Sequence, residues 1–157
     1  MFQAALRTAK RVTRETEISR KRISIPSVAV ADLASQFFER FDDKRVLIIG
    51  AGEMGQETLR YLADEGVRDV VVVNRRIERA EALAAEWNGR AARWERLHAE
   101  LAEADLVIST TGADRPIVTL EDYRKIEDAR YQRPLFILDL AIPRDFDPAI
   151  EEHGLNV

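Results

Sequence analysis

The sequence has 157 residues, of which 46% are hydrophobic and 33% are charged, and its net charge is −4. A chain of this length has room for one core of ordinary size. No apolar run approaches the roughly 18 residues of a membrane span, and the N-terminus lacks the apolar segment of a signal peptide, so we expect a cytoplasmic protein without membrane contact. The absence of cysteine excludes disulfides, thiolate metal sites and a cysteine nucleophile within this sequence.

The charge is distributed unevenly along the chain. Residues 1–25 contain seven Lys or Arg residues and two Glu residues, a net charge of +5 that leaves −9 for the remainder. Two interpretations of this basic arm stay open, an RNA contact and a solvated helix face, and charge alone favours the second.

Apolar residues at helical spacing predict two helices ahead of the main domain. One spans residues 1–14, and the other starts near Pro26, which suits the first turn of a helix, and continues to Phe41. We therefore expect a helical joining segment over residues 1–42 and a separate domain over residues 43–157. The apolar stripes of the two helices need a partner, and a second copy of the chain, bound through residues 1–40, would supply one.

The main domain begins with the stretch KRVLIIGAGEMG. Its apolar run, Val46–Ile49, is typical of a strand buried on both faces of a parallel sheet. The six residues after it match G-x-G-x-x-G and are Gly50, Ala51, Gly52, Glu53, Met54 and Gly55. In this motif the first glycine permits a tight turn, the second allows a pyrophosphate to approach the backbone, and the third lets the next helix pack closely. We predict a dinucleotide site at this turn.

Downstream segments give the motif its structural context. Helical spacing over Glu57–Glu65 and an apolar run over Val70–Val73 complete a strand, turn, helix and strand unit, whose crossover is right-handed by rule. We predict an α/β fold, a Rossmann-type doubly wound parallel sheet with an N-terminal helical extension.

The residues after the second strand discriminate between cofactors. Asn74, Arg75 and Arg76 stand where an NAD-specific site usually has an acidic residue that binds the ribose hydroxyls. Guanidinium groups grip a phosphate and stack on adenine, so this sequence favours NADP; the alternative is that both arginines only solvate a helix start.

The remainder of the chain continues the alternation of helices and strands. The predicted elements are a helix over Ile77–Trp87, a short edge strand over Arg90–Trp94, a helix over Leu97–Ala104, a strand over Asp105–Ser109, a helix from its N-cap Thr119 through Ala129, a strand over Leu135–Leu140, and the beginning of a strand at 155–157. Trp87 and Trp94 have the spacing of packing residues.

Two further segments follow strands at the edge where open α/β sheets bind ligands. The predicted contacts of the nicotinamide half are Thr110, Thr111, Gly112, Ala141, Ile142 and Pro143. We predict no catalytic and no metal-binding residue. His98 and His153 lack the spacing of a metal site, and the hydroxyls of Ser109, Thr110 and Thr111 have no indicated base.

Several of these stretches together resemble one family. GAGEMG after an apolar strand, VVVNRR, AEADLVISTTGA and above all LDLAIPRDFDP are similar to the NADP-binding domain of glutamyl-tRNA reductase. FQAALRTAKRVTRETEIS and ISIPSVAVADLA resemble the segment that joins the family's catalytic and nucleotide domains. The resemblance covers essentially the whole chain and implies NADPH as cofactor, glutamyl-tRNA as the partner of the parent enzyme, and a role in making tetrapyrroles. It also implies that a Glu at position 53, inside the glycine motif, is usual in this family.

The family's cysteine-bearing catalytic domain and its helical dimerisation region have no counterpart in this sequence. The resemblance therefore implies a truncated nucleotide-binding core that binds the cofactor but does not by itself reduce glutamyl-tRNA, because it lacks the thiolate that forms the thioester. Two alternatives stay open: the NADP domain of a shikimate-dehydrogenase-type oxidoreductase, which also pairs a glycine turn with Asn-Arg, and a non-enzymatic nucleotide sensor.

Overall fold

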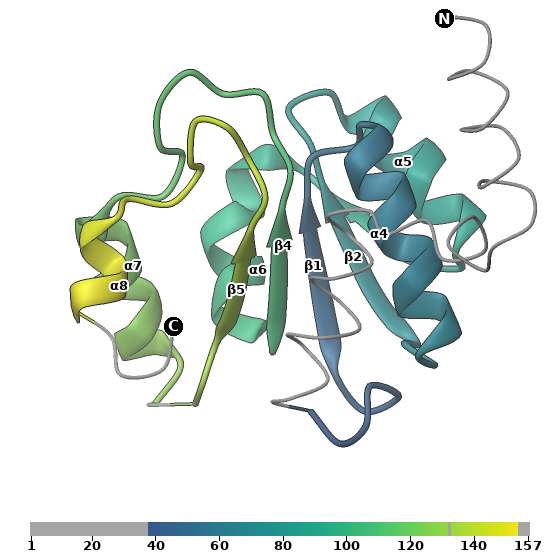
Figure 1. The fold of residues 1–157 in the computed structure, drawn as a ribbon, viewed down its shortest axis with the longest axis horizontal. Coiled ribbons are helices and arrows are strands. Elements are labelled where there is room, and N and C mark those ends of the chain that lie inside the picture. The colour runs from purple at the N-terminus through teal and green to yellow at the C-terminus, as the bar shows by residue number, and fades with distance from the viewer. Residues whose placement is uncertain (1–37, 132, 154–157) are drawn as a thin grey trace, which may run out of the picture.

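The computed structural model describes residues 38–131 and 133–153. Five parallel strands form one sheet in the order β3-β2-β1-β4-β5. The strands are β1 (Arg45–Ile49), β2 (Asp69–Val73), β3 (Arg90–Ala92), β4 (Leu106–Ser109) and β5 (Phe136–Asp139). The order reverses direction at β1, so the sheet is doubly wound and the predicted fold class is confirmed (Figure 1).

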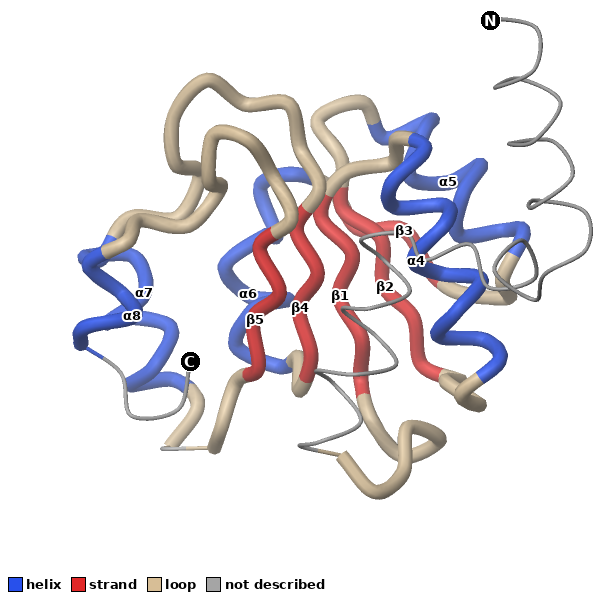
Figure 2. The backbone as a smooth tube through the Cα atoms, viewed as in Figure 1, coloured by secondary structure: helices blue, strands red, loops and turns tan. Residues whose placement is uncertain are grey.

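Helices cover both faces of the sheet, as the tube view also shows (Figure 2). The helical elements are α4 (Glu53–Asp64), α5 (Ile77–Glu86), the 3₁₀ turn η3 (Trp94–Arg96), α6 (Leu97–Glu103), α7 (Leu120–Ala129) and α8 (Ala149–His153). Successive side chains of β1 point to opposite faces of the sheet and so belong to two different layers of the core. Ile48 packs with side chains of α4 and α5, whereas Ile49 packs with side chains of α6, α7 and α8. The strands are apolar on both sides because both faces are covered.

Local sequence signals explain the ends of several elements. Thr119 caps α7: its hydroxyl accepts a hydrogen bond from the amide of Asp122, whose carboxylate in turn accepts one from the amide of Thr119. Asn88, just after α5, has a φ of 51° and turns the chain toward Gly89. The predicted capping residue and the predicted order of elements from β1 to β5 are therefore confirmed.

The structure differs from the sequence-based expectation at both ends of the domain. The second predicted helix was expected to continue to Phe41. This prediction is wrong for residues 38–41, the part of it that the structure describes, because they are not helical. Phe41 is instead buried against the sheet, and its ring lies 5.7 Å from that of Phe38, which also contacts Phe136 at 6.0 Å. This aromatic cluster explains Phe41, the one described residue that had been assigned to the helix face. Helix α8 was not predicted.

Some sequence-based expectations fall outside the described residues. These are the helix over residues 1–14, most of the helix starting near Pro26, the dimer contact through residues 1–40 except for its last three positions, and the strand beginning at 155–157. None of the helices within the described ranges is long and apolar enough to span a membrane.

Candidate nucleotide-binding site

The carboxyl ends of four strands meet at one edge of the sheet. Ile49 is in register with both Val73 and Ser109, and Ser109 is in register with Asp139. The amide of Gly50 donates to the carbonyl oxygen of Val73 at 2.9 Å, so the chain leaves β1 beside the end of β2. The segments predicted to bind a ligand therefore all start from the same edge.

A crevice of about 250 Å³ opens at this edge. It is lined by Gly50, Ala51, Gly52, Asn74, Arg75, Arg76, Arg79, Trp94, Thr110, Thr111, Gly112 and Ala113. The structure thus brings together the glycine turn, the Asn-Arg-Arg segment and the loop after β4, which lie far apart in the sequence. The other predicted site residues, Glu53, Met54, Gly55, Ala141, Ile142 and Pro143, do not line this crevice.

The three glycines of the turn differ in what surrounds them. Gly50 has a φ of +104°, and a Cβ atom there would lie 2.9 Å from Thr110 Oγ1. A Cβ atom on Gly55 would lie 2.7 Å from the carbonyl oxygen of Gly50, so α4 approaches β1 too closely for any side chain. Gly52 has no protein atom within 4 Å of such a Cβ position and faces open space in the crevice. Gly50 and Gly55 shape the turn, and Gly52 leaves room for a ligand.

Glu53 opens α4 and is exposed. Its side chain lines a neighbouring hollow with Gln56, Arg79 and Glu86, which lies between α4 and α5. A carboxylate in the first turn of a helix is stabilised by the helix dipole. This placement makes a glutamate compatible with the predicted pyrophosphate site at the glycine turn, since the crevice lining itself contains no carboxylate.

Three arginines line the β2 side of the crevice. Arg75 and Arg76 are exposed, and Arg79 joins them from the first turn of α5. In the described part of the chain, no carboxylate forms an ion pair with any of the three. Asn74 holds the turn by donating from its side-chain amide to the carbonyl oxygen of Arg76 at 2.9 Å. This side of the crevice is therefore suited to bind an anion such as a phosphate.

Trp94 and Arg79 were not predicted as site residues. The Arg75 guanidinium lies over the Trp94 ring, 5.5 Å from its centroid, which is within the range of a cation–π contact. The prediction that Trp94 is only a packing residue was incomplete, since its ring is half-buried against the core and also lines the crevice. Arg79 could have been predicted from the helix that starts at Ile77, because a helix there places Arg79 one turn after Arg76 and on the same face.

The loop after β4 borders the crevice on its other side. The Thr110 amide donates to the carbonyl oxygen of Ile49 at 2.8 Å, and Thr110 Oγ1 lies 3.3 Å from the same oxygen. Thr111 accepts a hydrogen bond from the amide of Ala113 at 3.2 Å. Gly112 is exposed, and a Cβ atom added to it would meet no other atom within 4 Å, so this loop also leaves space for a ligand.

The loop after β5 runs beside the loop after β4 (Figure 1). Ala141 is buried, whereas Ile142 is 91% exposed. The Asp139 carboxylate shapes this loop by accepting hydrogen bonds from the amides of Ala141 at 3.1 Å and Phe146 at 3.0 Å. Burial raises the pKa of the Asp139 carboxyl above its ordinary value, and these two amides act in the opposite direction.

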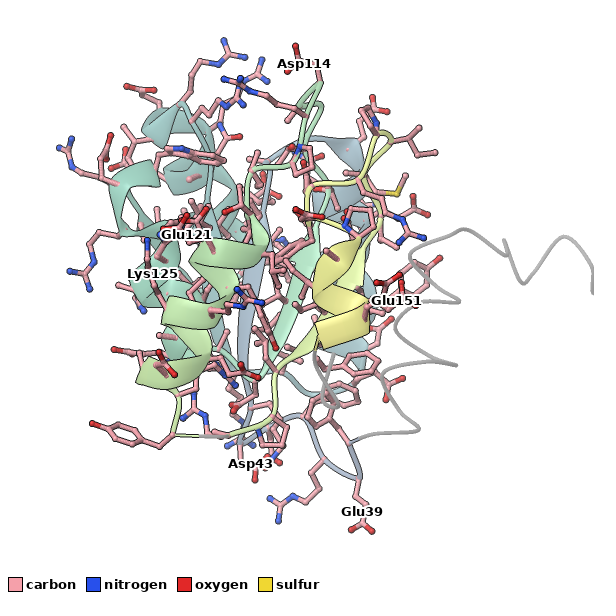
Figure 3. The ribbon with its side chains drawn as sticks, turned by 90° about the vertical axis from the view of Figure 1, so that its left-hand side faces the viewer. Glu39, Asp43, Asp114, Glu121, Lys125 and Glu151 are labelled. Carbon is pink, nitrogen blue, oxygen red and sulfur yellow. The ribbon has the colours of Figure 1, made fainter. Side chains whose placement is uncertain are left out.

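Among the described residues, no group of three or more His, Cys, Asp or Glu side chains is placed to hold a metal ion. His98 is exposed, which confirms its predicted surface position. Asp114 marks the end of the molecule that carries the crevice, whereas Glu39 and Asp43 lie at the opposite end (Figure 3).

The sheet order and the crevice at its reversal point define the class of this protein as a nucleotide-binding Rossmann domain. Residues 32–157 match the family model described as Shikimate / quinate 5-dehydrogenase, and the chain belongs to this family.

Individual relatives and structures confirm the resemblance found in the sequence. The chain is 48% identical over 156 residues to a glutamyl-tRNA reductase of Rhodopirellula baltica, covering 99% of this chain and 37% of that protein. It is 41% identical to that of Bacillus pumilus, covering 97% of this chain and 33% of the relative. The structure of glutamyl-tRNA reductase from Methanopyrus kandleri superimposes with a TM-score of 0.76 at 42% identity, over 96% of this chain and 38% of that one. The chain thus spans about a third of the length of the curated relatives it matches.

Proposed function

We propose that this chain is the NADPH-binding domain of a glutamyl-tRNA reductase, an enzyme that reduces glutamyl-tRNA to glutamate-1-semialdehyde for tetrapyrrole synthesis. The observation that carries the proposal is the composition of the crevice, which joins a glycine turn to three arginines without a carboxylate. The 48% identity to a reductase over 99% of the chain supports the choice of parent enzyme.

Different residues of the crevice are suited to bind different parts of this cofactor. Gly52 leaves space at the start of α4, where backbone amides attract a pyrophosphate. Arg75, Arg76 and Arg79 supply positive charge for the 2′-phosphate that distinguishes NADP from NAD. When bound, the cofactor supplies a hydride, and the loops after β4 and β5 orient its nicotinamide and exclude water. In our proposal Ala141, Ile142 and Pro143 contact the nicotinamide end, beyond the crevice itself.

The proposal assigns the rest of the reaction to other parts of the parent enzyme. We infer that glutamyl-tRNA binds there, that the domain boundary lies near residue 42, and that the chain associates with a second copy through residues 1–40. Because the sequence contains no cysteine, it offers no thiolate to form a thioester with the glutamyl group. The purified chain should therefore bind NADPH and form no semialdehyde when glutamyl-tRNA is added.

Calorimetric titration of the chain with NADPH and NADH tests the proposal. We expect the dissociation constant for NADPH to be more than tenfold lower, about 1.4 kcal/mol in binding free energy. Equal constants would reject the NADP assignment, and the absence of binding to either cofactor would reject the domain's function.

A second candidate is the NADP domain of a shikimate-dehydrogenase-type oxidoreductase, which the family match over residues 32–157 favours. Both candidates predict NADPH binding, so cofactor affinity does not separate them. The parent gene does: a domain with a reactive cysteine upstream of this chain would favour the first candidate, and its absence would favour the second.

A further inference from the structure

Asp145 is a completely buried carboxylate behind the crevice. It lies in the loop between β5 and α8, has 0% exposure and does not line the crevice. Its Oδ2 atom accepts hydrogen bonds from Ser109 Oγ at 2.6 Å and from the amide of Thr111 at 3.0 Å, and Oδ1 accepts one from Thr111 Oγ1. All three donors belong to the end of β4 and the loop that follows it.

The backbone of the same segment makes a second connection to this loop. The Asp145 carbonyl oxygen accepts hydrogen bonds from the amides of Ile117 at 2.7 Å and Val118 at 3.1 Å, and the amide of Asp147 donates to the Val118 carbonyl oxygen at 3.0 Å. The loop after β4 is therefore fixed at its beginning by the carboxylate and at its end by the backbone. Residues 112–116 form the stretch between these two anchors.

These contacts determine which polar groups of the loop remain available to a ligand. The Thr111 amide and hydroxyl hydrogen both point to Asp145, and the amide of Thr110 is bound to Ile49. Within the described residues, the amide of Gly112 donates to no protein acceptor, and Gly112 lines the crevice. The carboxylate thus engages both hydrogen-bond donors of Thr111, whereas the amide of Gly112, which lines the crevice, stays open to a ligand.

We propose that Asp145 is the positioning residue for the nicotinamide half of the site: from behind the crevice, its carboxylate fixes Ser109 and Thr111 and so sets the conformation in which Thr110 and Gly112 meet the cofactor. The inference rests on the proposed function, because it assumes that NADPH occupies the crevice. It assigns no contact with the cofactor to Asp145 itself. The adenosine half, bound by the arginines after β2, does not depend on Asp145.

The substitution Asp145→Asn tests this role with little change in shape. An amide group has one acceptor oxygen, so it cannot accept hydrogen bonds at both carboxylate positions. Affinity should be measured for NADPH and for adenosine 2′,5′-bisphosphate, which carries the 2′-phosphate and no nicotinamide. We expect the Kd for NADPH to rise about tenfold and that for the bisphosphate to change less than about twofold.

A matched control is Asp147→Asn, the same change two residues further along. Among the residues that the structure describes, the Asp147 carboxylate accepts a hydrogen bond from the nearby amide of Ala149 at 3.0 Å and from no residue of the loop after β4, so both affinities should stay unchanged. Thr111→Val should also weaken NADPH selectively, and the double variant should lose less than the sum of the two single losses, because both changes affect the hydrogen bond between Thr111 Oγ1 and Asp145 Oδ1. If Asp145→Asn fails to fold, Ser109→Ala removes one of the three hydrogen bonds and should show the same selective loss, about threefold for NADPH.

Three results would overturn the inference. Equal losses for both ligands would mean that Asp145 only supports the fold, and no loss for either would mean that the carboxylate does not position the loop. Additive losses in the double variant would mean that Asp145 does not act through Thr111. A wild-type chain that fails to bind the bisphosphate would instead reject the proposed function, and the inference with it.

Discussion

The Arg75 guanidinium lies over the Trp94 ring at 5.5 Å from its centroid. The two residues lie just beyond the carboxyl ends of two different strands, since Arg75 follows β2 and Trp94 follows β3. This cation–π contact holds one of the three crevice arginines beside the place proposed for the adenosine phosphate. Under the proposed function, the preference for NADPH depends on a contact between residues that are 19 positions apart in the sequence.

Arg75→Ala should reduce the preference for NADPH over NADH. Removing the guanidinium removes a charged contact with the 2′-phosphate, which NADH lacks, so we expect about a tenfold loss of NADPH affinity and a smaller loss for NADH. Calorimetric titration with both cofactors measures the two changes. Arg60→Ala is the control, because Arg60 is exposed on α4 and does not line the crevice. Equal losses for both cofactors would contradict the assignment of Arg75 to the 2′-phosphate.

Substitutions of two glycines in the same turn should have different effects. Gly52→Val should weaken NADPH and NADH alike without lowering the melting temperature, because the side chain would enter the open crevice. Gly55→Ala should lower stability by about 1–3 kcal/mol, because its Cβ would lie 2.7 Å from the Gly50 carbonyl oxygen. Thermal unfolding and cofactor titration of both variants check the pair. A destabilised Gly52→Val with normal affinity would show that the turn is misassigned.

The pair of Glu100 and Arg90 should make stability depend on pH. Glu100 is 3% exposed and accepts hydrogen bonds from Arg90 at 3.1 and 2.5 Å, and this contact lowers the pKa of Glu100 below its usual value of 4.5. A carboxyl group whose pKa is lower in the folded than in the unfolded state stabilises the fold fully at pH values above its unfolded pKa. This stabilisation is lost as the pH falls through the folded-state pKa. Because Arg90 is half exposed, we expect Glu100→Gln to cost about 1 kcal/mol at pH 7 and less at pH 3.

Denaturant unfolding of the Glu100→Gln variant across this pH range measures the effect. The control is Glu121→Gln, which removes the partner of Lys125 on the surface of α7 at 2.8 Å and should not change stability measurably (Figure 3). A stability difference for Glu100→Gln that stays constant between pH 7 and pH 3 would show that the charge of Glu100 does not contribute.

The sequence was sufficient to predict the succession of strands along the chain, because the apolar runs of β1, β2, β4 and β5 and the turns beside them are local signals. It also located the glycine turn, since the spacing of Gly50, Gly52 and Gly55 encodes the backbone geometry directly. Asp145 was not found because its role depends on Ser109, which lies 36 positions away. Phe41 was misassigned for the same reason: an aromatic residue that packs on a sheet and one on a helix face have the same local pattern.

The most direct test of the central claim is amide chemical-shift mapping of the labelled chain during titration with NADPH. The account predicts shifts at Gly52, Arg75, Gly112 and Ile142, which lie at the carboxyl edge of the sheet or on loops that extend from it. Amides of Glu39 and Asp43, at the opposite end of the molecule (Figure 3), should not change. Shifts confined to the glycine turn, or centred on the opposite end, would contradict the proposed path of the cofactor across the sheet.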